Sequence, residues 1–208
     1  MDSFSLSSYW MIGLVVLISL GFLAIILYRN RLFRLKQGVH EQLASDLGLK
    51  ITYTEQQDFT IFGENRTYPV HITPHHAALA GKKKVRWSVK TSVPMVNPNL
   101  MAIRISRNDV EPSPFLDQVP VYKPQTLAHS IAPWLEVLTN DLMFSHRILS
   151  DDIKMDLVVA FKQVPEAILF VMDNELACII PGLLYENYPP EVYKAFLNLL
   201  LNIKDELN

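Results

Sequence analysis

Residues Tyr9–Tyr28 constrain this chain most, because twenty consecutive positions carry no Asp, Glu, Lys, Arg or His. At about 1.5 Å per residue, a helix of this length covers the roughly 30 Å hydrocarbon core of a bilayer. Tyr9, Trp10 and Tyr28 stand at the two edges of the run, where amphipathic rings prefer the membrane interface. The run predicts a transmembrane helix over residues 9–28, preceded by a short N-terminal segment, 1–8.

The charges around this run predict that the helix is retained and which way it points. A cleaved signal peptide would need basic residues before the run, whereas Met1–Ser8 holds Asp2 and no Lys or Arg. Basic residues stay on the cytoplasmic side of a span, so we expect segment 1–8 outside and the rest of the chain in the cytoplasm. The chain resembles membrane-anchored bacterial proteins with small cytoplasmic domains, which implies the bacterial inner membrane. The cations of this flank are Arg29, Arg31, Arg34 and Lys36.

Beyond the flank, the chain has the composition of one folded domain. Half of the 208 residues are apolar, 19% are charged, and the formal net charge is −2. This content of apolar residues excludes intrinsic disorder, and residues 49–208 suffice for a single compact core. Cys178 is the one cysteine, which excludes an intramolecular disulfide and zinc sites built on two or more cysteines.

Apolar spacing divides the soluble part into regions and predicts an α+β fold. Residues 29–48 combine the basic flank with a juxtamembrane stalk helix that stops at Gly48, a residue suited to a helix end. Five short segments within 49–107 alternate apolar and polar residues, which predicts an antiparallel sheet with one packed face and one solvated face. Residues 108–125 form a proline-rich connector.

The last region, 126–208, is predicted as a helical and hairpin portion. Leu127, Ile131, Leu135 and Leu138 have helical spacing. Further on, a helix over Asp151–Gln163, a hairpin over Ala167–Ile180 and a final helix after Pro190 give a helix–hairpin–helix order. The sequence does not decide whether this portion shares a core with the sheet.

Charge is segregated within the soluble part. No Asp or Glu occurs between Asn65 and Asn108. We therefore predict an interaction face on the polar side of the sheet, with anionic lipid headgroups or an acidic partner subunit as its ligand; a solvated face without a partner is the alternative. Nucleic acid fits least, because aromatic residues for base stacking are missing from this face. The predicted interaction face comprises Lys82, Lys83, Lys84, Arg86, Lys90 and Arg104.

Candidates for chemistry are weak. His71, His75 and His76 form a histidine cluster that resembles no known metal signature, so no metal site and no cofactor are expected. Asp151 begins a predicted helix, where an acidic side chain suits the helix dipole, and Cys178 lies in an apolar strand. The sequence holds no catalytic motif. We therefore expect a membrane-anchored accessory or scaffold subunit that binds other membrane-complex subunits; the alternatives are a membrane-tethered enzyme and a membrane-bound regulator that contacts nucleic acid.

Overall fold

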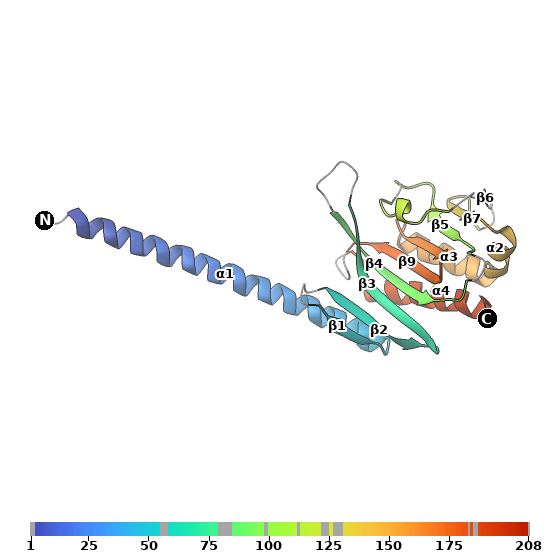
Figure 1. Cartoon of the computed structure of the whole chain (residues 1–208), viewed down its shortest axis with the longest axis horizontal. Coiled ribbons are helices and arrows are strands. Elements are labelled where there is room, and N and C mark those ends of the chain that lie inside the picture. The colour runs from blue at the N-terminus through green and yellow to red at the C-terminus, as the bar shows by residue number, and fades with distance from the viewer. Residues whose placement is uncertain are drawn as a thin grey trace. The chain divides into compact units, whose positions relative to one another are not determined.

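The computed structural model describes residues 3–54, 58–78, 85–97, 100–111, 113–121, 125–126, 131–182, 184 and 187–207. The chain divides into two compact units, Met1–Gln42 and Leu43–Asn208. The elements (Figure 1) are α1 (Ser3–Asp46), β1 (Lys50–Tyr53), β2 (Phe59–Asn65), β3 (Tyr68–Ala78), β4 (Val85–Pro94), β5 (Ile103–Arg107), the 3₁₀ turn η1 (Leu116–Gln118), β6 (Gln125–Thr126), β7 (Leu135–Thr139), α2 (Leu142–Ile148), α3 (Asp151–Gln163), β8 (Ile168–Met172), β9 (Glu175–Pro181) and α4 (Pro190–Leu207).

The described part of the first unit, from Ser3 on, is helical. α1 extends from Ser3 to Asp46 as one α-helix, so the stretch expected to form a stalk is helical up to Asp46. Gly48 follows with φ +67°, a left-handed conformation that glycine adopts without steric cost. The backbone N–H of Leu49 then donates to the carbonyl of Ala44 at 2.8 Å, which closes the helix end before β1 begins.

The second unit is built on the predicted antiparallel sheet. Within the described residues, nine strands pair antiparallel in the order β1-β2-β3-β4-β9-β8-β5-β7-β6. The β8–β9 hairpin lies between β4 and β5, with Val89 opposite Ile180 and Ile103 opposite Val171. The late hairpin therefore completes the centre of the sheet that the earlier strands begin, and the two halves form one folded unit.

Helices α2, α3 and α4 cover one face of this sheet, and in Figure 1 α3 and α4 lie behind the strands. Their apolar side chains join those of the strands in one buried cluster that includes Ile61, Val89 and Ile103. The rings of Phe161 in α3 and Phe196 in α4 pack at 5.9 Å, edge to face. Burial of this apolar area is the main term that stabilises the domain.

The other face of the sheet is covered in part by the proline-rich connector. Phe115 and Val119, on either side of η1, are 0% and 2% exposed. They belong to a second buried cluster with β8 and β9 side chains such as Phe170 and Ile179. The predicted solvated face is thus apolar and closed at its centre, because the two central strands carry apolar residues on both sides.

The expected helix after residue 126 is wrong. From residue 131 on, the described chain forms β7 instead, and β7 pairs with β5 so that Val137 lies opposite Ile105. Leu135, Val137 and Thr139 are buried while Glu136 and Leu138 are half-buried, which is the period of a strand. Apolar spacing of three and four residues fitted a helix equally well, and pairing with β5 decides the outcome; Leu127 lies outside the described residues.

Candidate functional site: the cationic end of the apolar helix and the polar sheet face

The apolar side chains of α1 are exposed. Trp10, Phe22 and Tyr28 are 77%, 65% and 65% exposed. The segment Trp10–Asp46 holds an 18-residue window of mean hydropathy 2.7, of which none is buried. A continuous apolar surface of this size is unstable in water. By length and composition, α1 can cross a membrane.

The four cations that follow the uncharged run Tyr9–Tyr28 divide between opposite sides of the helix. Arg31 and Arg34 share a side, because residues three and four apart are neighbours on a helix surface. Arg29 and Lys36, seven residues apart, lie together on the opposite side. The flank predicted as one basic group is therefore two pairs of charges that face in different directions.

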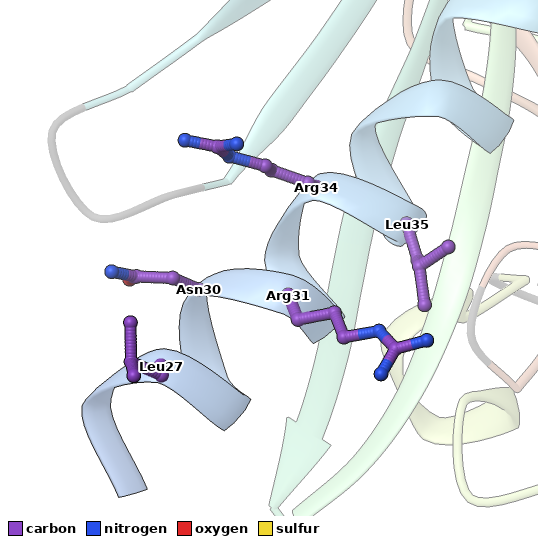
Figure 2. Close-up of a pocket in the computed structure, with 5 residues that line it drawn as sticks. All are labelled: Leu27, Asn30, Arg31, Arg34 and Leu35. Atoms are coloured by element: carbon purple, nitrogen blue, oxygen red, sulfur yellow. The ribbon is translucent and has the colours of Figure 1, made fainter. Parts of the chain in front are cut away.

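A shallow, open hollow lies on the side that carries Arg31 and Arg34. Figure 2 shows Leu27, Asn30 and Arg34 along one edge of it and Arg31 with Leu35 along the other. The lining thus offers two guanidinium groups and one amide between two leucines. Among the described residues, neither arginine has a hydrogen bond or an ion pair, and residues 3–40 include no Asp or Glu. Guanidinium groups recognise phosphate and carboxylate oxygens through paired N–H donors.

The polar sheet face has the predicted placement but a different electrostatic character. Arg86 and Lys90 in β4 and Arg104 in β5 alternate with core residues such as Val89 and Ile103, so they lie on the side away from the helices. Each of the three has a partner within the domain, as described next. Lys82, Lys83 and Lys84 lie outside the described residues.

Lys90 and Arg86 form ion pairs of unequal quality. Lys90 Nζ lies 2.6 Å from Glu175 Oε2, with the two side chains 26% and 33% exposed, and 5.8 Å from the ring centroid of Phe170. Arg86 Nη1 lies 3.8 Å from Glu166 Oε2, and both side chains are about half exposed, at 49% and 46%. A long, solvated pair of this kind contributes little. Arg86 therefore remains accessible to another anion, whereas Lys90 does not.

Arg104 holds the connector. Its Nη1 donates to the carbonyl oxygens of Val119 and Leu116 at 3.2 and 3.4 Å. These carbonyls belong to the segment around η1 that covers Phe170 and its neighbours. The arginine expected to bind a ligand is thus a structural link between β5 and the connector.

The remaining described cations of the acid-free window are also compensated. Arg66 Nη1 donates to Asn202 Oδ1 at 2.7 Å and lies 3.7 Å from Asp205 Oδ2, both in α4. Arg107 donates to both carboxylate oxygens of Asp109 at 2.7 and 2.8 Å. The sequence signal was the absence of acids nearby in the chain, and it missed acids supplied by distant strands and helices. Non-local pairing of β4 with β9 could be found only from the fold.

The three histidines do not converge. His71 and His75 lie on the face away from the helices, four residues apart along β3 and so separated by about 13 Å, while His76 points to the opposite face. His75 Nε2 is 2.6 Å from Gln118 Oε1, next to Phe115 at a ring distance of 5.7 Å. His76 lies 5.5 Å from the ring of Trp87. In the part of the chain that the structure describes, no group of three or more His, Cys, Asp or Glu is placed to hold a metal ion.

The other residues considered for catalysis or metal binding, Asp151 and Cys178, have roles in the structure of the domain. Ser150 caps α3 by accepting from the N–H of Ile153, and Asp151 forms an ion pair with Lys154 at 2.8 Å. Cys178 is fully buried, and burial raises the pKa of its thiol to about 12. A neutral, inaccessible thiol is a poor nucleophile and a poor metal ligand.

Fold and surface together define a mixed helix and antiparallel-sheet protein with an apolar N-terminal helix long enough to cross a membrane. No protein-family model and no curated protein matches the sequence. Among solved structures, the chain is similar to the crystal structure of the mycobacterial trehalose monomycolate transport factor A, TtfA. The match has a TM-score of 0.54 and covers 81% of this chain and 92% of that one, at 12% identity. At this identity the likeness is one of fold.

Proposed function

We propose that the protein is a single-pass membrane-anchored accessory or scaffold subunit. α1 holds it in the bilayer, and the domain of residues 43–208 binds other subunits of a membrane complex. The observation that carries this proposal is the exposed apolar surface of α1, on which Leu17 is 72% exposed. Transfer of such a surface from water into hydrocarbon is favourable by about 25 cal/mol per Å², so a bilayer is its natural environment.

The proposed orientation has the N-terminus outside and the domain in the cytoplasm, in a bacterial inner membrane. Four cations follow the apolar run and one acid precedes it, and the side that carries more Lys and Arg is retained in the cytoplasm. A fold similar to that of a protein described as a transport factor supports an accessory role in a membrane process. It supports no substrate for this chain.

For the domain we propose docking on an acidic partner or on anionic headgroups, through the β3–β4 end of the polar face. Arg86 is half exposed and weakly paired, and the sequence places three lysines at 82–84 beside it. Lys90 and Arg104 contribute less, because docking through them would cost the contacts that they make within the domain. We also propose that the role is not enzymatic; the structural partners of Asp151 and the burial of Cys178 support this.

Co-purification tests the accessory role. The full chain is extracted from its native membrane in mild detergent after brief chemical cross-linking, and its companions are identified by mass spectrometry. We expect a defined membrane protein in reproducible stoichiometry, retained by the wild type and reduced by Arg86→Glu. Recovery as a lone monomer under several conditions would overturn the proposal.

Cysteine labelling tests the orientation. Cys178 is buried and its thiol has a raised pKa, so the native chain should not react with the maleimide. In intact cells we expect a membrane-impermeant maleimide to label Ser3→Cys, while Asp173→Cys in the exposed β8–β9 turn reacts only after lysis. The reverse pattern would place the domain outside. Resistance of the wild type to alkaline carbonate extraction tests the anchoring itself.

A further inference from the structure

We propose that the hollow lined by Leu27, Asn30, Arg31, Arg34 and Leu35 is a seat for the phosphate of one anionic phospholipid. This inference rests on the proposed membrane anchoring and deepens it, because it assigns a specific ligand to one side of α1. It differs from general attraction between a basic flank and an acidic bilayer, which would use all four cations equally.

Depth along the helix fits the headgroup layer. If the hydrocarbon core ends near Tyr28, Arg31 lies about 4.5 Å and Arg34 about 9 Å beyond it at 1.5 Å per residue. The polar layer of a bilayer extends roughly 5 to 8 Å on each side of the core. The two arginines therefore bracket the level of the lipid phosphates, while Leu27 remains at the level of the acyl chains.

The chemistry of the lining fits a phosphate. Arg31 and Arg34 both line the hollow, and in Figure 2 their guanidinium groups extend in opposite directions from α1, while the Asn30 amide adds a third donor group. Both arginines are exposed, so rotation about their side-chain bonds would bring the donors to one anion. With no acid in residues 3–40, no carboxylate of this segment competes for the guanidinium groups. An anion with several acceptor oxygens matches this set of donors better than a zwitterionic headgroup, whose own ammonium group is repelled.

The opposite side of the helix supplies a matched control. Arg31→Gln/Arg34→Gln and Arg29→Gln/Lys36→Gln each remove two positive charges within the same two turns of α1. General attraction to an anionic surface falls equally in both variants. A phosphate seat is lost in the first variant alone.

The test uses full-length protein reconstituted in phosphatidylcholine vesicles, where orientation in a cell plays no part. Phosphatidylglycerol or phosphatidylcholine with a spin label on its acyl chain is added, and electron paramagnetic resonance measures the fraction of label immobilised by the protein. We expect the wild type and Arg29→Gln/Lys36→Gln to prefer phosphatidylglycerol. Arg31→Gln/Arg34→Gln should lower this preference by about fivefold or more.

Three outcomes overturn the inference. Equal losses in both double variants would leave only diffuse attraction, and no preference in the wild type would mean that α1 does not select anionic lipid at all. Removal of the preference by inorganic phosphate, at ionic strength matched with chloride, would indicate a site for free phosphate instead of a headgroup. Carbonate extraction distinguishes failure of this inference from failure of the proposed function. A chain that resists extraction but shows no lipid preference would refute the phosphate site and remain consistent with membrane anchoring by α1.

Discussion

The ammonium nitrogen of Lys90 lies 2.6 Å from a carboxylate oxygen of Glu175, on the neighbouring strand of the sheet. The lysine extends past Phe170, with its charge 5.8 Å from the ring centroid. A cation that the sequence places on a binding face is therefore neutralised inside the domain. This ion pair links β4 to β9 and so connects the early strands of the sheet to the late hairpin.

A double-mutant cycle measures this pair. Lys90→Met and Glu175→Gln should each lower the free energy of unfolding, with a coupling energy of about 1 kcal/mol, because both side chains are partly shielded from solvent. Urea unfolding of the full chain in detergent provides the values. The Lys154–Asp151 pair, whose carboxylate side chain is 96% exposed, is the control and should couple more weakly; equal coupling would refute the special role of Lys90.

Substitution by methionine should destabilise the domain at Arg104 and have little effect at Arg86. Arg104→Met removes two bonds to the connector carbonyls and should cost about 2 kcal/mol of unfolding free energy. Arg86→Met, on an exposed side chain, should stay within about 0.5 kcal/mol. Hydrogen exchange at Leu116–Val119 should accelerate in Arg104→Met alone. Unchanged exchange there would mean that Arg104 does not hold the connector.

Local sequence patterns predict where strands lie and which way their side chains face, but they do not predict which distant residues those side chains contact. Alternation of Val89 with Lys90 and of Ile103 with Arg104 located strands and their two faces, because side-chain direction in a strand follows from sequence spacing alone. Glu175, which neutralises Lys90, is 85 residues away in the chain, and strand order is not encoded in local spacing. The predicted helix at β7 fails for the same reason, since only pairing with β5 distinguishes the apolar pattern of β7 from that of a helix. The positive charges of Arg31 and Arg34 are evident in the sequence, whereas the hollow that they line follows only from their positions on one side of α1.

Cys178 should be inert until the domain unfolds. With a pKa of about 12, about one thiol in ten thousand is ionised at pH 8, and the side chain is fully buried. We expect no maleimide reaction in the folded chain and rapid reaction in denaturant, whereas Asp173→Cys in the exposed turn reacts at once. Prompt labelling of Cys178 would contradict the burial.

The same burial predicts how stability depends on alkaline pH. The thiol of the unfolded chain loses its proton near pH 9, while the folded state keeps it until about pH 12. Between these values the folded state binds more protons, so the free energy of unfolding falls as pH rises. The contribution of the protonated Cys178 thiol to the free energy of unfolding is complete below pH 9 and is lost as the pH rises toward 12. Cys178→Ala should flatten this part of the pH profile relative to wild type in urea titrations.

Leu100 is held in a left-handed conformation by two asparagines. Its φ is +49° and its side chain is 69% exposed. Asn97, itself 2% exposed, bonds the N–H and the carbonyl of Met101 at 3.0 and 2.7 Å, and Asn140 Nδ2 donates to the carbonyl of Leu100 at 3.0 Å. The bonds on both sides fix a backbone geometry that costs a leucine about 1–2 kcal/mol.

Glycine at this position should therefore stabilise the domain. Leu100→Gly relieves the left-handed strain and loses little burial, and the added freedom of the unfolded chain offsets part of the gain, so we expect about 0.5 kcal/mol more stability. Val96→Gly in the same loop, at a residue 83% exposed and outside the left-handed region, should lose about 0.5–1 kcal/mol. Asn97→Ala should lose about 2 kcal/mol, because two backbone groups lose their partner. If thermal unfolding gave Leu100→Gly the same loss as Val96→Gly, the left-handed conformation would be wrong, because both side chains are exposed and the two positions differ mainly in φ.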